Sequence, residues 1–356
     1  MGGLKIEVVD LSKIDKKELE NKYSYSNLTT FNGCEMEWKL NYIDKEEKLP
    51  NAYGLAGGIV HDKFENMALG KDTSGRMYDD IIKMFSDNNT DITNAGRDKW
   101  HLDIRTLGDN LDIIGKIFKD YNVVDVEREF LIKCTADGLE PFYMNGYIDI
   151  ILEKDGEIYV YDWKTSSIFN RENRKKNALQ LLLYKEALEA SGMNVKEVAW
   201  VMVKYVDIKV GNNRKQRLQL NDFPEKIKQQ LYDIGMTREE YTRIKISRKF
   251  SDIPEHIMEQ IEIYPHILTY NATDEEMHRL REFMYLTVNS INRAKKTNTW
   301  QYRESDDLFY CEHLCGYRHI CPMLSELNGN MNNVQLNGDK FASKEFIDDV
   351  LSDIFD

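Results

Sequence analysis

The stretch Gly146-Tyr-Ile-Asp149-Ile-Ile-Leu-Glu-Lys-Asp-Gly156-Glu-Ile-Tyr-Val-Tyr-Asp162-Trp-Lys164-Thr decides the fold of this chain. Two runs rich in β-branched and aromatic residues flank an Asp-Gly dipeptide, which predicts two antiparallel strands joined by a tight turn. Asp149 lies seven residues before Gly156 and Asp162 six residues after it, so the hairpin brings the two carboxylates together. Because side chains on a strand repeat every second residue, Lys164 is expected on the same face as Asp162.

Two carboxylates and a lysine on neighbouring strands suit the hydrolysis of a phosphodiester. Asp149 and Asp162 could share one hard cation, Mg²⁺ or Mn²⁺, because such ions take oxygen ligands and keep several waters. Lys164 could hold or deprotonate a metal-bound water, or neutralise charge on a phosphate. Glu127 or Glu129, on a predicted preceding strand, could add a carboxylate. Acidic and lysine side chains near hairpin ends are also common in solvated loops, so this set alone leaves both interpretations open.

Two other segments contribute polar side chains in a fixed order along the chain. The glycine-rich run over residues 54–65 leads into a predicted helix with His61 near its start. Taken alone, His61 is more simply interpreted as a surface or partly buried histidine. Residues 177–188 form a helix by composition, and Gln180 and Tyr184 lie one turn apart on the same face.

In this order, the residues resemble the motif of the PD-(D/E)XK nucleases of the RecB type, a group that includes the RecB and AddB nuclease domains and CRISPR-associated exonucleases. The resemblance extends from about Tyr25 to Pro322 and rests on His61, Asp149, Asp162, Lys164, Gln180 and Tyr184. It implies an α/β fold with a restriction-endonuclease-like core, a mixed central sheet flanked by helices. It also implies that the histidine and both acids bind the metal, that the lysine is catalytic, and that the glutamine and tyrosine line the site. The second acid is Asp where many members have Glu, a variation within the pattern.

The cysteines form a second pattern. They are Cys34, Cys134, Cys311, Cys315 and Cys321. An odd number without a secretion signal argues against a disulfide framework and indicates a reducing compartment. The last three lie within eleven residues, a spacing typical of ligands for a soft metal, and Cys34 is the natural candidate for the fourth ligand. Cys134, at the end of a predicted strand, is most simply a small buried or edge residue.

The split arrangement of these four cysteines resembles the iron-sulfur staple of the same nuclease family, which implies a 4Fe-4S cluster. Three residues separate Cys311 from Cys315, where the family usually has two. This departure leaves room for His313 or His319 to replace a cysteine, or for zinc to replace the cluster. In each case ligation would join segments nearly three hundred residues apart and would stabilise the fold.

The net charge of −13 is unfavourable for a protein that binds a polyanion. Local basic clusters soften this objection. The candidate DNA contacts directly after the second strand are Arg171, Arg174, Lys175 and Lys176. Two later clusters, over residues 214–217 and 243–249, either line a DNA path or are solvated loop charges. The chain has no Gly-x₄-Gly-Lys-Ser/Thr phosphate loop, so it carries no helicase motor of that kind.

We expect a nuclease domain over residues 1–325, with a mostly helical insertion over 61–121, then a flexible linker over 326–340 and an acidic amphipathic tail over 341–356. The tail is either a docked helix or a segment that binds a replication or recombination protein. No apolar stretch reaches the length of a membrane span and no secretion signal is visible, so we expect a cytoplasmic protein.

The resemblance and the residues together imply a metal-dependent deoxyribonuclease with Mg²⁺ or Mn²⁺ and a 4Fe-4S cluster as cofactors. We favour an exonuclease that acts on DNA ends or single strands in recombination, repair or replication. One alternative is a CRISPR spacer-processing nuclease. Another is a non-catalytic DNA-binding or scaffold subunit, which the retention of all the catalytic residue types argues against.

Overall fold

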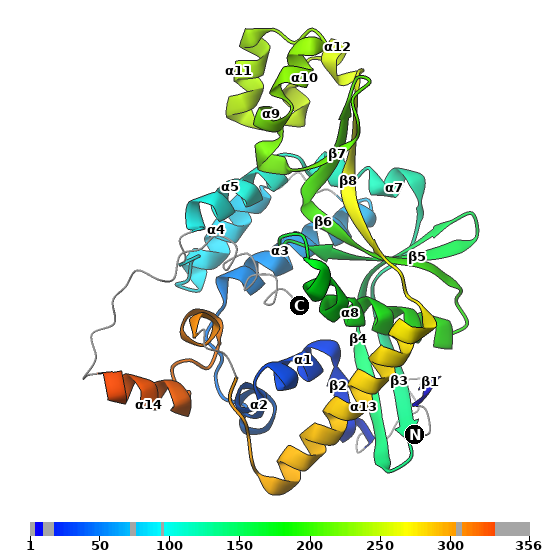
Figure 1. Ribbon diagram of the computed structural model, residues 1–356, viewed down its shortest axis with the longest axis vertical. Coiled ribbons are helices and arrows are strands. Elements are labelled where there is room, and N and C mark those ends of the chain that lie inside the picture. Colours follow the sequence, from blue (N-terminus) through cyan, green and yellow to red (C-terminus); the bar gives the residue numbers. More distant parts are fainter. Residues whose placement is uncertain (1–3, 10–17, 72–75, 94–95, 304–307, 332–356) are drawn as a thin grey trace.

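The computed structural model describes residues 4–9, 18–71, 76–93, 96–303 and 308–331 of the 356-residue chain. A mixed eight-stranded sheet forms the centre of the molecule and helices flank it (Figure 1). The expected α/β class with a restriction-endonuclease-like core is confirmed. No helix within these ranges is both long and apolar enough to cross a membrane.

The strands follow one another along the chain with helices between them. They are β1 (Lys5–Val8), β2 (Lys22–Ser24), β3 (Asn122–Ala136), β4 (Leu139–Lys154), β5 (Glu157–Lys164), β6 (Val195–Val210), β7 (Gln216–Gln219) and β8 (Ile261–Tyr270). Their order in the sheet is β1-β3-β4-β5-β6-β7, while β2 pairs with β4 and β8 pairs with β6. β4 and β5 are antiparallel, whereas β5 and β6 are parallel and joined by a helical crossover.

The longer helices are α1 (Tyr25–Gly33), α3 (Ala52–Ala68), α4 (Met77–Asp87), α5 (Arg97–Gly108), α8 (Arg171–Ala190), α11 (Arg238–Ser247), α13 (Asp274–Thr297) and α14 (Pro322–Met331). The short α-helices are α2 (Glu35–Lys39), α6 (Leu111–Ile114), α7 (Ile117–Asp120), α9 (Phe223–Lys226), α10 (Lys228–Asp233) and α12 (Glu255–Met258). Three 3₁₀ turns are η2 (Glu18–Asn21), η4 (Leu220–Asp222) and η5 (Phe250–Asp252), and two π-turns are η3 (Leu40–Asp44) and η6 (Tyr310–Leu314).

The predicted hairpin is present as β4 and β5. Its register pairs Lys154 with Glu157, so Asp155 and Gly156 form a two-residue turn. Their φ angles are 54° and 81°. Positive φ at both central positions is what the type I′ hairpin turn requires, and Asp-Gly is among the sequences that adopt it most readily. The local sequence signal therefore determines this hairpin and its register.

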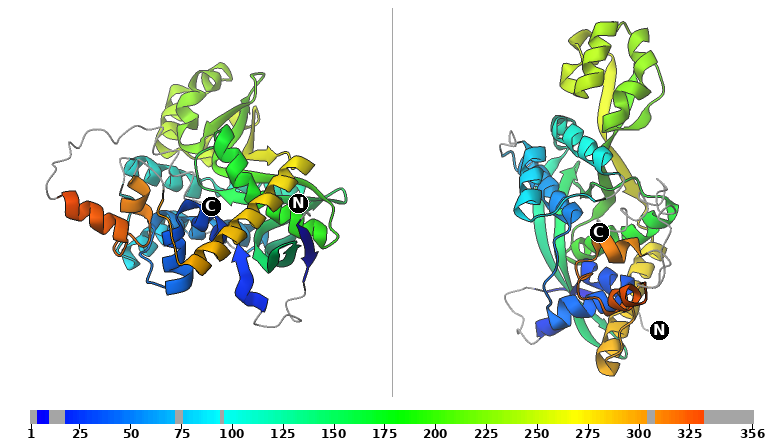
Figure 2. Two further views of the ribbon diagram at one scale, coloured as in Figure 1. Left: turned by 60° about the horizontal axis from the view of Figure 1, so that its bottom comes forward. Right: turned by 90° about the vertical axis from the view of Figure 1, so that its left-hand side faces the viewer.

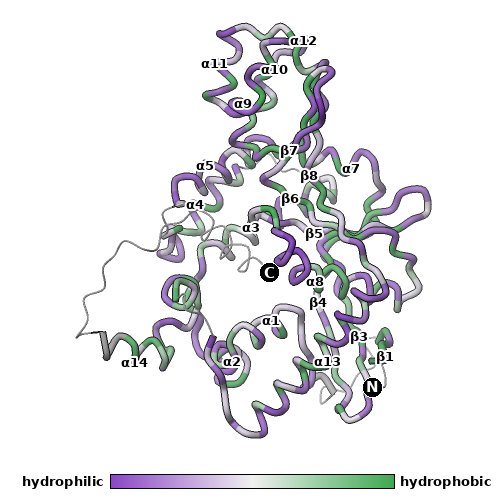
Figure 3. Tube along the Cα trace, viewed as in Figure 1, coloured by the Kyte–Doolittle hydropathy of each residue, from purple (hydrophilic) through white to green (hydrophobic). Residues whose placement is uncertain are grey.

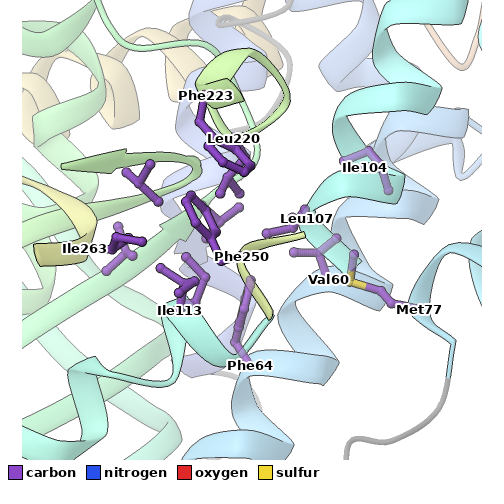
Figure 4. Packing of buried hydrophobic residues seen from close by; sticks show 14 of the residues in the cluster. Val60, Phe64, Met77, Ile104, Leu107, Ile113, Leu220, Phe223, Phe250 and Ile263 are labelled. Carbon is purple, nitrogen blue, oxygen red and sulfur yellow. The ribbon is translucent and has the colours of Figure 1, made fainter. Parts of the chain in front are cut away.

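Alternating residues of the central strands pack into two cores, one on each face of the sheet. On β5, Tyr161 and Trp163 belong to one core, with α3, α4 and α5. Val160 belongs to the other, which contains buried residues of α1, α8 and α13. Figure 4 shows part of the first core, where residues of α3 and α5 lie near Phe223 and Phe250. Asp162 and Lys164 have the same parity as Val160, so they face α8.

The helical region that follows α2 begins earlier than the sequence suggests. The glycine-rich run was expected to lead into a helix, but α3 already starts at Ala52, where the Asn51 side chain accepts a hydrogen bond from the Tyr53 amide. Ala56, Val60 and Phe64 repeat every four residues and are buried. Packing of this stripe outweighs the cost of glycines inside a helix, which is about 1 kcal/mol each.

Two peripheral parts complete the molecule. Helices α9 to α12 form a lobe at the far end of β6, β7 and β8 (Figures 1 and 2). Near the C-terminal end of the described residues, α14 continues to Met331 and so extends into the segment expected to be a linker. The rest of that linker and the acidic tail lie outside the described residues.

Candidate active site and cysteine cavity

The two predicted acids lie side by side on the central hairpin. The pairing of β4 with β5 ends at Ile150 and Tyr161, and Asp149 and Asp162 are the next residues on the two strands. Asp149 is 6% exposed and Asp162 is 1% exposed. The Asp149 Oδ2 atom accepts a hydrogen bond of 3.0 Å from the backbone amide of Trp163. Asp149 is therefore held in place by the neighbouring strand itself.

Lys164 connects the hairpin to α8. Its Nζ lies 3.3 Å from Asp162 Oδ2 and donates a hydrogen bond of 3.0 Å to Gln180 Oε1. The Gln180 amide in turn donates to the Tyr184 hydroxyl at 2.9 Å. Since α8 packs on the face of the sheet to which Asp162 and Lys164 point, the crossover helix fixes the orientation of the lysine.

His61 closes the other end of the row. It lies on α3, and its Nδ1 is 3.3 Å from Asp149 Oδ2. Its side chain is 30% exposed, in contrast to the buried acids. The structure thus brings all six residues named from the sequence into one continuous row, in the order His61, Asp149, Asp162, Lys164, Gln180 and Tyr184.

The two buried carboxylates of this row disfavour each other's charged form. Burial and the neighbouring charge of Asp162 raise the pKa of Asp149 well above its usual range. Burial also lowers the pKa of His61, so the imidazole is neutral and can act as a metal ligand. A bound cation would reverse this balance, because it stabilises the carboxylates in their charged form.

Two glutamates extend the acidic site beyond the predicted set. Glu127 on β3 and Glu65 on α3 share a hydrogen bond. Burial and the charge of Glu127 raise the pKa of Glu65 to about 7. Glu127 has a φ of 50°, unusual for a residue within a strand. Of the two strand glutamates considered from the sequence, Glu127 is the one at the site. Glu65 was missed, although its position four residues after His61 puts it on the same helix face.

The donor set suits a hard divalent cation. Asp162 Oδ2 is buried and makes no hydrogen bond within the described part of the chain, apart from its charge contact with Lys164. Carboxylate oxygens with a neutral imidazole beside them are the donors that Mg²⁺ and Mn²⁺ accept. No group of three or more His, Cys, Asp or Glu side chains within the described ranges already has the spacing of a closed metal site. Such a cation would therefore have to draw these side chains together.

The predicted basic cluster lies at the start of α8. Arg171, Arg174, Lys175 and Lys176 occupy the first two turns of α8. The Asn170 side chain caps this end by accepting hydrogen bonds from two backbone amides. Figure 3 shows these turns as a hydrophilic stretch. Lys176 lies one helical turn before Gln180, so the basic turns lead directly into the row.

Four of the five cysteines line one small cavity, although within the described ranges their side chains do not form a group with metal-ligand spacing. Cys34, Cys311, Cys315 and Cys321 all line a cavity of about 20 Å³ between α2, η6 and the start of α14. All five cysteines are free thiols. Burial raises the pKa of Cys311 to about 11 and also raises the pKa values of Cys34 and Cys315. Cys134 is fully buried on β3 and lies apart from this cavity.

The unusual spacing of the first two C-terminal cysteines has a structural counterpart. The backbone amide of Cys315 donates to the carbonyl of Tyr310 at 2.8 Å, an i to i+5 hydrogen bond, and η6 is a π-turn. A π-turn accommodates one extra residue in a helical segment. Neither His313 nor His319 lines the cavity.

Comparison with known proteins agrees with this geometry. The family model of the PD-(D/E)XK nuclease superfamily matches residues 22–322. The chain belongs to this superfamily. Its members typically use divalent metal ions, which suits the acidic row. No curated protein matches the chain. Among solved structures, the chain is similar to SSO0001 at 13% identity and a TM-score of 0.33, over 88% of this chain and 90% of that one, a likeness too distant to support an argument about function.

Proposed function

We propose that the protein is a metal-dependent deoxyribonuclease, and that it acts as an exonuclease on DNA ends or single strands. The observation that carries this proposal is the continuous row from His61 to Tyr184, in which every contact joins two residues of the superfamily motif. Recombination, repair and replication are the processes that need such an activity.

Each residue of the row has a role in this proposal. His61, Asp149 and Asp162 would hold Mg²⁺ or Mn²⁺, which supplies an activated water and charge neutralisation. The Lys164 ammonium, positioned by Gln180, would neutralise charge that develops on the scissile phosphate. Tyr184 would fix the Gln180 amide. Glu65 and Glu127 would accept a proton near the open end of the row.

DNA would approach along the basic start of α8. Arg171, Lys175 and Lys176 are exposed there, beside the row. Phosphate contacts from such side chains supply most of the affinity of a nuclease for its substrate and make it dependent on salt. The local cluster thus offsets the unfavourable net charge of −13.

The cysteine cavity supports a second proposal, that Cys34, Cys311, Cys315 and Cys321 hold a 4Fe-4S cluster. Their position around one cavity, from both ends of the matched region, and the burial of Cys311 and Cys315 suit a soft metal centre. Zinc is the alternative. Protein purified without oxygen should contain iron and acid-labile sulfide. Colourless protein with one zinc per chain would favour the alternative.

Cleavage of end-labelled DNA tests the nuclease proposal. The purified chain should degrade linear DNA with Mg²⁺ or Mn²⁺ and leave it intact with chelator. Lys164→Ala should lower the rate by roughly a hundredfold or more, because it removes transition-state charge stabilisation. Lys154→Ala, at the other end of the same hairpin, is the matched control and should cut like the parent. Equal rates in the parent and Lys164→Ala would overturn the assignment.

Covalently closed single-stranded DNA separates an exonuclease from an endonuclease. An exonuclease leaves the circle intact while it degrades the linear form of the same sequence. Cutting of the circle would replace the exonuclease proposal with an endonuclease. The absence of cleavage on every DNA, with the fold and DNA binding retained, would favour the scaffold alternative.

A further inference from the structure

A cavity with a polar lining, distinct from the cysteine cavity, lies next to the row between α1, η3, α8 and the loop after η6. Its volume is about 330 Å³, within the range of small-molecule sites. Three cations line it, Lys48, Lys176 and Arg303, against a single carboxylate, Glu37. The Tyr310 hydroxyl donates to both oxygens of Glu37, at 3.0 and 3.2 Å. The cavity is therefore suited to an anionic ligand.

Two of these cations rest directly on glycines. A Cβ atom at Gly316 would lie 2.3 Å from Lys48 Cγ, and one at Gly33 would lie 3.1 Å from an Arg303 guanidinium nitrogen. Any larger residue at Gly316 would have to displace the lysine stem. Arg303 is also stacked 4.0 Å over the Tyr310 ring. Close backbone approach thus sets the position of both cationic side chains at the cavity.

The remaining walls are aromatic and polar. Tyr25 and Phe283 line one side, with ring centroids 6.3 Å apart and planes tilted by 45°. The hydroxyls of Thr29 and Thr30 on α1 line another. A cationic side, an aromatic side and hydroxyl groups are the combination with which proteins bind single-stranded nucleic acid, because bases stack on rings while phosphates contact cations.

The cavity is adjacent to the catalytic row through α8. Lys176 lines the cavity, and Gln180, which holds Lys164, lies one turn further along the helix, about 6 Å away along its axis. The Tyr25 hydroxyl donates to the Lys176 carbonyl at 3.2 Å and so ties α1 to this turn. A strand whose phosphate lies at the row would reach the cavity with a neighbouring nucleotide.

We propose that this cavity binds one nucleotide of single-stranded DNA beside the scissile phosphodiester, with its phosphate against Lys48, Lys176 and Arg303 and its base against Tyr25 and Phe283. This inference rests on the proposed nuclease function, since it takes the DNA strand to lie along the row. It makes Lys48, which is remote from the acids in sequence, a determinant of how the strand is held.

Salt-dependent binding tests the proposal without any cleavage. The full chain in chelator is titrated with fluorescein-labelled hexathymidylate, and polarisation is followed at several KCl concentrations. Each lost contact to a phosphate of a single strand reduces the slope of log affinity against log salt by about 0.7. We expect this change for Lys48→Gln, together with a several-fold weaker affinity at a fixed salt concentration.

Two further variants sharpen the test. Gly316→Ala should weaken binding in the same direction as Lys48→Gln, because the added methyl group displaces the lysine. Lys45→Gln removes an exposed cation three residues away that does not line the cavity, and it should bind like the parent. Melting temperatures confirm that each variant is folded, and Lys48→Gln remains informative if Gly316→Ala is not.

The outcomes separate this inference from the nuclease proposal. If the parent cuts DNA but Lys48→Gln keeps the parent's slope and affinity, the cavity assignment is wrong and the nuclease stands. If nothing cuts DNA but the slope changes as expected, the nuclease proposal fails while the cavity remains a single-strand site. An equal change of slope on a blunt-ended duplex hairpin would overturn the assignment to a single strand.

Discussion

The acidic row and the cysteine cavity are both largely buried, but different elements of the fold support them. The row is carried by adjacent strands β4 and β5 and by the long helices α3 and α8, which pack into the two main cores. The cysteines lie on short elements, at the junction of α1 and α2, on η6 and just before α14. The buried apolar cluster described there consists of Leu40, Cys315 and Tyr317, with Met36 and Tyr310 packed against it, and is much smaller than either main core.

This difference has a physical consequence for the role of each proposed metal. The row keeps its geometry from the sheet, so a cation bound there would be needed for chemistry and not for folding. The buried apolar cluster at the cysteine cavity is small, so ligation would supply much of the free energy that holds this region together. Loss of the first metal should therefore cost activity, and loss of the second should cost stability.

The largest expected effect is on the cysteine cavity. Cys315→Ser should lose the metal centre and lower the melting temperature by roughly ten degrees or more, since structural metal sites contribute on the order of 10 kcal/mol. Cys134→Ala is the matched control. It removes one buried sulfur from β3 and should cost about 1 kcal/mol without loss of metal. The metal content and the melting temperature are measured. If Cys315→Ser and the parent have the same metal content and the same melting temperature, the claim that metal ligation stabilises the cysteine cavity is wrong.

A smaller effect of opposite sign is expected at the acidic row. Burial and Asp162 raise the pKa of Asp149 above its value in the unfolded chain. The folded protein therefore loses stability as the pH rises from the unfolded pKa to the folded one, and the full cost persists above it. In chelator at pH 8, Asp149→Asn should consequently be more stable than the parent by roughly 1 kcal/mol. It should also lose cleavage, because the amide lacks the charge that a hard cation needs.

Asp155→Asn is the control for this variant. Asp155 lies in the turn of the same hairpin with φ of 54°, which asparagine tolerates. It should change neither stability nor cleavage. If Asp149→Asn were less stable than the parent in chelator at this pH, ionised Asp149 would not carry the proposed cost from burial and from the charge of Asp162.

We expect Glu65 to make the affinity of the row for Mn²⁺ depend on pH. Its pKa of about 7 means that it loses its proton as the pH rises from 6 to 8. The negative charge near the row, and with it the affinity for Mn²⁺, should increase over this interval. Glu65→Gln should flatten the increase by a few fold, whereas Glu129→Gln, exposed on the same strand as Glu127, should leave it unchanged. Calorimetric titration with Mn²⁺ at several pH values provides the measurement, and identical profiles for Glu65→Gln and the parent would exclude this role.

The smallest effect is expected from truncation after Gly338. Every proposed ligand lies before Pro322, so cleavage of naked DNA and the melting temperature should stay close to those of the full chain. If the tail binds a replication or recombination protein, the truncated chain should lose that binding. A large drop in melting temperature would mean that the tail helps to stabilise the fold. Metal ligation would then not be the main support of the C-terminal part of the chain.

The sequence predicted the parts of the molecule that depend on local signals. The Asp-Gly turn determined the hairpin, and the composition of residues 177–188 indicated α8. The order of motif residues then indicated which side chains meet in the row. The same logic underestimated the length of α8, because Asn170 is a helix cap that moves the helix start to Arg171, six residues before the predicted segment.

The remaining features depend on contacts between distant segments. β8 pairs with β6 but contains Pro265, which weakens its strand signal. Lys48 approaches Gly316 closely, and these residues are far apart in the chain. No local sequence pattern therefore predicts the cavity that Lys48 lines. Glu65 is a different case, since its spacing from His61 was visible and only its pairing with Glu127 gives it meaning.

Binding of Mn²⁺ to the acidic row tests the central claim most directly. Electron paramagnetic resonance of free Mn²⁺ measures how much of the ion the protein takes up. We predict that the parent binds Mn²⁺ and that Asp162→Asn loses this binding while its melting temperature in chelator is at least that of the parent, because the sheet and not the ion supports the row. Equal Mn²⁺ binding by the parent and Asp162→Asn would contradict the claim that this row is the metal site.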